Sequence, residues 1–400
     1  MRPIESSSGR KTGVVFRVLG DYGFVSCDEY PDQDIYFKPA WFQGSPALAE
    51  GESVTFQLKS YDGNLQAHYL TRAAAEGGVS QPAQPPGLPQ SHNILQWAYL
   101  GYLPNILSEL KGLALDEQWD FRDEASNPDK PHPILYSYLF HTFGRLVLED
   151  KILINGNASY AAFNTGLVDD RYEPIHALFV PNDDRRSSPW QLTGFCIAGE
   201  GADGQNLVRH FTPLPSTAHY FEHPVDLLYD TRAGEPRLDW RHIITERIDR
   251  YPKDFVQDHW PQGYEAKDDQ SLNEDERKAY YRGLGEAIEH DSRTYRRIMN
   301  RVKDAIDLSI KRVAWNFKTA IPTYYPRVKH LQLLLPLCLL SDDHVDLALA
   351  VEKTPSGSYL GHTVLPLDWA YKNARLVCRP DSDWLIPEQI EEQSADEDGT

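Results

Sequence analysis

Hydrophobic and polar positions alternate with a period of two between residues 13 and 70. Successive side chains of a strand point to opposite faces, so this pattern is typical of short strands with one buried face. The predicted strands are residues 13–18, 22–26, 34–37, 53–58 and 66–70. The turn residues that separate them are Gly20, Pro31, Gly44, Gly51 and 62–64. Five short strands in so short a stretch predict a small all-β OB barrel within residues 1–72.

The alternation also divides side chains between the interior and the surface of this barrel. Val25, Ile35 and Phe37 are expected to point inward. The side chains expected to face solvent on the same two strands are Tyr22, Phe24, Tyr36 and Lys38. Rings beside a cation form a platform on which unstacked bases can lie. The pattern therefore predicts a surface for single-stranded RNA or DNA, with RNA as the first expected ligand.

A helical pattern begins after a linker rich in Pro, Gly and Gln at residues 73–92. Apolar residues recur at helical spacing in three segments, 93–101, 106–113 and 131–147. Strand-like runs follow at 151–154, 160–163, 175–180 and 192–197. Residues 200–263 mix Pro, His and acids and predict no clear element.

A second long helical pattern runs from a cap at Ser271 or Asn273 to about residue 317, with a break near Asp291. Its apolar stripe consists of Tyr295, Ile298, Val302, Ile306, Ser309 and Val313. Bases off this stripe form either a solvated face or a basic groove: Arg293, Arg296, Arg297, Arg301, Lys311 and Arg312. Further strands are predicted at 331–340, 345–351, 363–365 and 376–379. Residues 93–385 are thus predicted to be a larger α+β domain, followed by an acidic, disordered tail at 386–400.

The N-terminal motifs resemble those of the cold-shock domain family. Residues 13–15 resemble its opening strand, YGFV at 22–25 its first ribonucleoprotein motif and IYFK at 35–38 its second. Residues 48–56 and 63–67 are similar to its closing pattern. The resemblance implies an OB barrel that binds single-stranded nucleic acid.

Three positions depart from that family, and the loop after the first strand is shortened. Arg17-Val18 stands where the family usually has Trp-Phe, and Lys38 replaces a His. Arg17 and Lys38 can supply cation–π or phosphate contacts in place of the rings. The expected nucleic-acid-binding residues are Arg17, Tyr22, Phe24, Tyr36 and Lys38. The alternative is a structural barrel whose outward rings contact the second domain.

Several motifs of the larger domain resemble an uncharacterised bacterial family, domain of unknown function 3825. They are NTGL at 164–167, WNFKTAIP at 315–322, YYP at 324–326, LLPL at 334–337, and residues 359–365, 370–376 and 384–385. The resemblance implies a fold shared with proteins that often pair this domain with RNA-binding modules. It implies no reaction.

Composition changes this picture in two respects. The formal net charge of −19 repels the phosphates of a nucleic acid at long range, and the barrel contains few basic residues. Stacking is therefore expected to dominate binding, with about one to three phosphate contacts. Single, scattered cysteines fit reduced thiols, and no apolar run is long enough to span a bilayer, so a cytoplasmic protein without a membrane partner is expected.

Sequence motifs for common chemistries are missing: there is no Walker loop, GxGxxG, HExxH or GxSxG. His219 and His223 have a metal-like spacing, but nearby prolines oppose a helix there. The acids Asp342, Asp343, Asp346 and Glu352 fit either a Mg²⁺ site or, more simply, an acidic turn before an edge strand. No metal and no cofactor is expected.

Three polar sets remain as a candidate ligand site in the larger domain. They are Asn164, Thr165 and Gly166; Lys318, Tyr324 and Tyr325; and Tyr371, Asn373 and Arg375. Backbone N–H groups, cations and rings that converge in space could hold a nucleotide or an RNA end. Each set also has a simpler structural explanation when it is considered alone. Residues 164–166 would form a turn, Tyr324 and Tyr325 would pack at the start of a loop, and Asn373 and Arg375 would lie on a surface edge.

Three functions follow for the whole chain. The first is an RNA-binding protein whose larger domain acts on the RNA, reports on it or binds a partner. The second is an enzyme acting on RNA or nucleotides, with Asn164, Lys318 and Arg375 as its polar core. The third is a scaffold that binds only protein. Whether the chain is an enzyme stays open.

Overall fold

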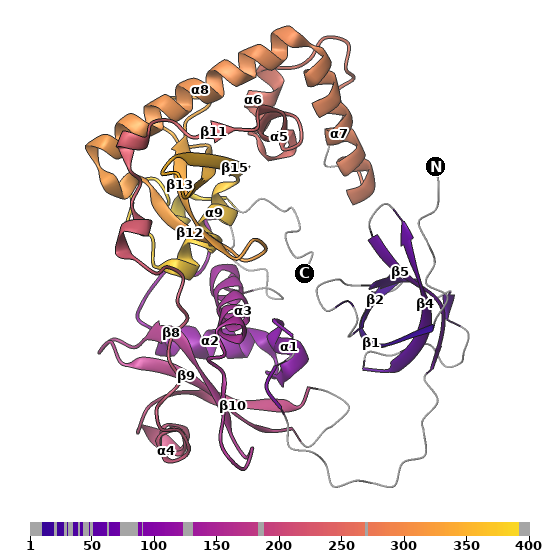
Figure 1. Ribbon diagram of the computed structural model, residues 1–400, viewed down its shortest axis with the longest axis vertical. Coiled ribbons are helices and arrows are strands. Elements are labelled where there is room, and N and C mark those ends of the chain that lie inside the picture. Colours follow the sequence, from indigo (N-terminus) through magenta and orange to yellow (C-terminus); the bar gives the residue numbers. More distant parts are fainter. Residues whose placement is uncertain are drawn as a thin grey trace.

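The computed structural model describes residues 10–19, 22–27, 30, 35–38, 41–42, 48, 51–61, 64–72, 87–89, 91–122, 131–182, 188–268 and 271–391. Within them lie one closed barrel and two five-stranded sheets (Figure 1). Most of the predicted linker, the tail after residue 391 and the turn residues Gly20, Pro31 and Gly44 lie outside the described residues. The predicted fold class, a small β-barrel followed by a larger α+β region, is confirmed.

The barrel consists of the five expected strands. They are β1 (Arg10–Leu19), β2 (Tyr22–Ser26), β3 (Ile35–Phe37), β4 (Ser53–Tyr61) and β5 (Asn64–Arg72). Their order around the barrel is β1-β2-β3-β5-β4, with β3 parallel to β5. Inward-facing apolar residues such as Val15, Val25 and Phe56 fill the interior. The period-two pattern of the sequence produces this core because every second side chain of a strand points inward.

The first sheet and its helices occupy residues 94–210. The elements are α1 (Ile94–Trp97), β6 (Ala98–Tyr99), α2 (Leu103–Leu113), α3 (Pro133–Leu148), β7 (Leu153–Ile154), β8 (Ala161–Val168), β9 (Pro174–Pro181), β10 (Trp190–Ile197) and α4 (Gly201–His210). The strand order is β6-β10-β9-β8-β7. Strands β7 to β10 form an antiparallel meander, and the short β6 pairs with β10 in parallel.

The second sheet follows a stretch of short elements. These are the 3₁₀ helices η2 (Pro224–Leu227), η3 (Thr231–Ala233) and η4 (Ile248–Arg250), with β11 (Arg237–Leu238), α5 (Trp240–Ile244) and α6 (Lys253–Asp258). Then come α7 (Glu274–His290), α8 (Ser292–Trp315), η6 (Phe317–Thr319), β12 (Ile321–Tyr325), β13 (His330–Leu337), β14 (Leu347–Lys353), β15 (Tyr359–Leu365), α9 (Leu367–Val377) and η7 (Pro387–Gln389). The strand order is β11-β15-β14-β13-β12.

The two sheets repeat one order of elements. In each, a short strand is followed by helices, a four-stranded meander and a closing helix, and the short strand pairs in parallel with the last strand. The units stack in layers, α4, first sheet, α3 with α9, second sheet and α8 (Figure 1). One apolar core, which includes Phe163, Leu334 and Ala370, joins both sheets through α3 and α9. The larger domain is therefore a tandem of two similar α+β units.

The long helical pattern is confirmed, including its break. Asn273 caps α7 and accepts a hydrogen bond from the Glu276 N–H, while the Glu276 side chain accepts from the Asn273 N–H. Asp291 ends α7 and caps α8 through the N–H groups of Arg293 and Thr294. Such reciprocal caps satisfy amide groups that a helix start leaves without partners.

The bases of α8 contact groups of this chain. Arg301 donates to the Leu339 carbonyl and pairs with Asp342, and Arg312 also donates to the Asp342 carbonyl. Lys311 pairs with Asp307 one turn away. These contacts favour the solvated face over the basic groove.

Two predicted elements are wrong. The helix expected over residues 93–101 ends at Trp97, and Ala98 and Tyr99 form the strand β6. Residues 376–379 were expected to form a strand, but Leu376 and Val377 end α9, and Tyr371, Asn373 and Arg375 lie on that helix. The chain also stays packed beyond residue 386, because Ile390 is buried in the shared core. No helix in the described ranges is both long enough and apolar enough to cross a bilayer.

Candidate nucleic-acid interface and a second polar site

Aromatic side chains form a continuous row on the outside of the barrel. The ring-centre distances are 6.0 Å for Phe16–Phe24, 5.8 Å for Tyr22–Phe24, 6.0 Å for Tyr22–Tyr36, 6.1 Å for Phe24–Tyr36, 5.9 Å for Tyr36–Trp41 and 4.0 Å for Trp41–His68. We call these six residues the aromatic row, and Tyr22, Phe24 and Tyr36 its central platform. The row crosses four of the five strands or their ends, from β1 to β5.

The β1–β2 end of the row depends on a bulge and a glycine. Val15 pairs with Val25 and Arg17 with Phe24, so Phe16 is an extra residue in β1. The bulge places the Phe16 ring near Phe24 although Val15 remains buried. Gly23 is needed between the two platform rings of β2, because a Cβ there would lie 2.6 Å from the Arg17 carbonyl oxygen.

The β3–β5 end of the row depends on parallel pairing. Tyr36 pairs with Gln66, and Phe42 forms a further parallel bridge with Leu70. The backbone of Trp41 is thereby held beside β5. A second register shift, opposite Phe56 of β4, and a positive φ of 53° at Tyr69 allow Ala67 and Leu70 to be buried together. His68 then projects outward against Trp41.

Cations flank the row without dominating it. The Lys38 ammonium lies 6.0 Å from the centre of the Trp41 ring, and that of Lys59 lies 5.4 Å from the Tyr69 ring. Arg17 is exposed and paired in register with Phe24. Burial and the nearby charge of Lys59 lower the pKa of His68, so its ring is neutral at neutral pH. The surface presents neutral rings with cations at its edges.

All five residues expected from the sequence lie on or beside this row. Three further rings were missed: Phe16, Trp41 and His68. Phe16 was detectable, because it follows the inward-facing Val15 directly. Trp41 and His68 were not, because their proximity depends on the β3–β5 pairing and on a bulge.

The NTGL segment forms a buried irregularity within β8. The Asn164 side chain accepts from the Gly166 N–H at 2.9 Å and donates to the Pro215 carbonyl at 3.3 Å. Thr165 donates to the Ile175 carbonyl at 2.8 Å, and Gly166 adopts a positive φ of 77°. Asn164 and Thr165 therefore bind backbone groups of their own chain.

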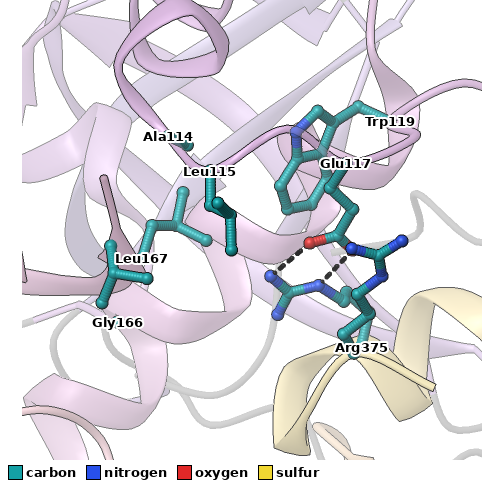
Figure 2. A pocket seen from close by; sticks show the side chains of 9 residues that line it. Ala114, Leu115, Glu117, Trp119, Gly166, Leu167 and Arg375 are labelled. Atoms are coloured by element: carbon teal, nitrogen blue, oxygen red, sulfur yellow. Dashed lines mark hydrogen bonds and ion pairs between the residues drawn. The ribbon is translucent and has the colours of Figure 1, made fainter. Parts of the chain in front are cut away.

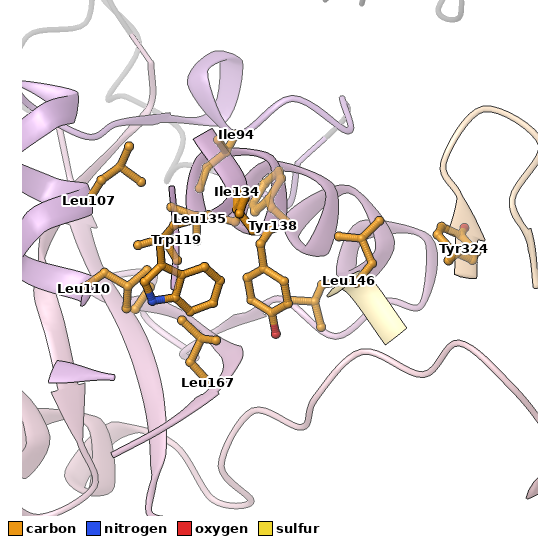
Figure 3. Packing of buried hydrophobic residues seen from close by; sticks show 14 of the residues in the cluster. Ile94, Leu107, Leu110, Trp119, Ile134, Leu135, Tyr138, Leu146, Leu167 and Tyr324 are labelled. Atoms are coloured by element: carbon orange, nitrogen blue, oxygen red, sulfur yellow. The ribbon is translucent and has the colours of Figure 1, made fainter. Parts of the chain in front are cut away.

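Arg375 is held by a carboxylate far away in the sequence. Its guanidinium donates to the two Glu117 oxygens at 2.6 and 2.9 Å, and both side chains are nearly buried (Figure 2). The guanidinium lies 4.9 Å from the Trp119 ring and 4.6 Å from the Tyr138 ring. Both rings belong to the apolar cluster around α3 (Figure 3).

Two adjoining hollows lie beside this pair. The first, of about 180 Å³, is lined by Ala114, Leu115, Glu117, Trp119, Gly166, Leu167, Val168, Arg375 and Arg379. The second, of about 200 Å³, is lined by Glu117, Gln118, Tyr371, Arg379, Pro380, Asp381, Ser382, Leu385, Ile386, Pro387 and Glu388. Both share Glu117 and Arg379. Burial raises the pKa of Tyr371, so its hydroxyl remains a neutral donor.

The three polar sets meet only in part. Gly166, Tyr371 and Arg375 line these hollows, and Lys318 pairs with Asp381 at the edge of the second. The residues that do not line either hollow are Asn164, Thr165, Tyr324, Tyr325 and Asn373. Tyr324 instead accepts a hydrogen bond from Arg145 at 3.3 Å and packs against Tyr220, while Tyr325 pairs with His330 at the β12–β13 turn.

Metal-ligand groups do not assemble among the described residues, where no three His, Cys, Asp or Glu side chains form a suitable cluster. His219 and His223 lie outside any helix. Asp346 accepts hydrogen bonds from the N–H groups of Leu339 and Leu340, and Glu352 pairs with His362. These acids have partners within the fold.

Comparisons with known proteins bear on the two parts of the chain differently. A solved structure described as "drosophila Unr CSD456" is 16% identical, with a TM-score of 0.16, and the match covers 18% of this chain and 30% of that one. No curated protein matches the chain. A family model, Domain of unknown function (DUF3825), matches residues 110–384, which is more than half of the chain. The chain therefore belongs to the DUF3825 family.

Proposed function

We propose that the N-terminal barrel binds single-stranded nucleic acid, RNA in the first place, by stacking bases on the aromatic row. The observation that carries the proposal is the unbroken contact of six rings, with centres 4.0 to 6.1 Å apart, on the outer face of the barrel. Every base has a flat π-face, so such a row suits an unpaired strand of almost any sequence.

Charge supports stacking as the main source of affinity. The chain carries a net charge of −19, and the flanking cations are few, with Arg17, Lys38 and Lys59 near the row. A protein that relied on phosphate contacts would require a dense basic surface. Sequence-tolerant single-strand binders usually combine stacking rings with a positively charged groove, so a row with few cations must obtain most of its affinity from the rings.

The test replaces the central platform in the full chain. Tyr22→Ala, Phe24→Ala and Tyr36→Ala, combined, remove three rings and leave the buried strand residues unchanged. Binding to a fluorescent oligo(U) should fall by at least 100-fold, since each stacked base contributes about 1–3 kcal/mol. Thr12→Ala, an exposed change on β1, is the control. Unchanged affinity in the triple variant, with its barrel folded by circular dichroism, would disprove the proposal.

A second candidate function concerns the two hollows beside Glu117. Arg379 is exposed and lines both hollows, which favours a phosphate group as ligand. Among the acids of the lining, Glu117 is paired with Arg375 and Asp381 with Lys318, whereas Glu388 lies in the second hollow, so the first hollow suits an anion better. Each hollow is smaller than the roughly 300 Å³ of a typical small-molecule site, so a phosphate rather than a whole nucleotide would enter. This fits the terminal phosphate of a strand or of a nucleotide.

Thermal unfolding tests this second candidate. Uridine monophosphate should raise the unfolding temperature of the full chain in a concentration-dependent way. Arg379→Ala should abolish the rise, whereas Arg293→Ala, at an exposed position on α8, should not. Equal shifts in both variants, or none in the wild type, would exclude a phosphate site here.

A further inference from the structure

We infer that Trp41 and His68 form a second stacking subsite, which takes one more base of the strand bound on the central platform. The inference rests on the proposed function of the barrel and extends it in one direction, toward β5. It predicts that the bound strand covers more nucleotides than β2 and β3, which carry the ribonucleoprotein-like motifs, could contact alone.

The geometry of the pair is that of a prepared stack. The two rings are 4.0 Å apart at an interplanar angle of 19°, the shortest ring contact of the aromatic row. Trp41 joins the platform through Tyr36 at 5.9 Å and 79°. A strand that follows the row therefore meets a ring of different orientation at this point, so the base there must turn relative to its neighbour.

The backbone fixes this pair before any ligand binds. The bridge between Phe42 and Leu70 holds the backbone of the adjacent Trp41 against β5, and the bulge at Tyr69 turns His68 outward. Both rings are only partly buried. Because little side-chain freedom remains to be lost, a base that stacks here gains contact at a small entropic cost.

Charges around the pair suit a phosphodiester backbone. The Lys38 ammonium lies 6.0 Å from the Trp41 ring centre, and Lys59 lies over Tyr69, which follows His68 in the chain. Both cations lie close enough to the pair to contact phosphates that flank a base stacked there. The neutral ring of His68 adds stacking surface without repelling either cation.

Trp41 also packs partly against the barrel core, so its removal can act on stability as well as on binding. Two variants separate these effects. Trp41→Ala removes the stacking surface, whereas Trp41→Phe keeps a flat ring at the same place. Trp315→Ala, at a tryptophan that is 92% exposed on α8, is the matched control.

The experiment measures affinities of the full chain for oligo(U) of four, six, eight and ten nucleotides. In the wild type, affinity should rise until the strand reaches the second subsite. Trp41→Ala should lose the final gain in affinity, which comes from the base at the second subsite. Long strands should then bind roughly 5- to 150-fold more weakly, while the affinity for short strands should not change. Trp41→Phe should retain most of this gain, and Trp315→Ala all of it.

Tryptophan fluorescence gives an independent readout, because Trp41 is the one tryptophan among residues 1–72. Long strands should quench it in the wild type, and Trp41→Phe should bind with that quenching lost. An equal loss of affinity at all lengths, or no loss in Trp41→Ala, would overturn the second subsite while leaving the platform intact. A wild-type chain that binds no strand at all would overturn the proposed function together with this inference.

Discussion

Glu117 and Arg375 form a buried ion pair with two parallel hydrogen bonds, of 2.6 and 2.9 Å, between a loop after α2 and the helix α9. The pair joins segments 258 positions apart in the sequence, and Arg375 also lies over two rings of the shared core. Arg375 is thus held by contacts within the fold. Arg379, two residues beyond the end of α9, lines both hollows and is exposed.

Removal of one charge of the Glu117–Arg375 pair should lower the free energy of unfolding much more than removal of both charges. Glu117→Gln leaves the guanidinium buried without a counter-charge, and we expect about 3–5 kcal/mol less stability. Glu117→Gln combined with Arg375→Met should recover a large part of that loss. Urea unfolding followed by tryptophan fluorescence reports on this region, because eight of the nine tryptophans lie beyond residue 72.

The control for that cycle is the surface pair of Lys318 and Asp381, where Lys318→Met should cost less than about 1 kcal/mol. Equal effects of Glu117→Gln and Lys318→Met would show that the buried pair contributes no more than a solvated one.

Gly166→Ala should destabilise the larger domain for two separable reasons. The residue has a positive φ of 77°, and an added Cβ would lie 2.5 Å from the Tyr138 hydroxyl oxygen. Gly101 provides the matched control, since its φ is 88° and no atom lies within 4 Å of an added Cβ. Gly101→Ala should cost about 1–2 kcal/mol from backbone strain alone, and Gly166→Ala clearly more. Similar losses of unfolding free energy for the two variants would exclude a steric role for Tyr138.

Acidification should weaken the larger domain through His176. This side chain is buried beside Asn164, and burial lowers its pKa below the ordinary 6.5. Once the pH falls below about 6.5, His176 takes up a proton more readily in the unfolded chain than in the folded one. The free energy of unfolding therefore decreases as the pH falls from 7 toward the pKa of the folded state. His176→Gln should flatten the change in urea midpoint between pH 7.5 and 5.5. A variant with the full wild-type pH dependence would assign that dependence to other groups.

Local sequence signals were sufficient where an element has one buried face. The period-two alternation around Val15 and Val25 predicted the barrel strands, and the side chains of Asn273 and Asp291 marked the start and break of the long helices. Both signals depend on contacts within a few residues or on a single periodicity. The platform rings followed from the same alternation.

Non-local features could not be predicted in this way. Helix α9 was missed for a different reason, because its sequence does carry an apolar stripe at helical spacing: Leu367, Ala370, Tyr371, Ala374 and Val377. Buried polar residues such as Asp368 and Arg375 interrupt the apolar pattern, and the end of the helix was mistaken for a strand. The burial of Arg375 depends on Glu117, and the Trp41–His68 stack depends on a bulge in β5. In each case the decisive partner is distant in sequence, and no local pattern records it.

Salt should affect nucleic-acid binding by the barrel only weakly. In the described part of the barrel, Arg17, Lys38 and Lys59 lie near the aromatic row, so one to three phosphates are expected to be neutralised on binding, and few counterions are released. For a single strand the expected slope of log K against log salt is about −0.7 per phosphate, hence roughly −0.7 to −2. Titrations of oligo(U) between 50 and 500 mM salt measure it, with Lys38→Ala expected to reduce the slope by about 0.7. A slope several times steeper would mean that phosphate contacts, rather than the rings, hold the strand, because stacking releases no counterions.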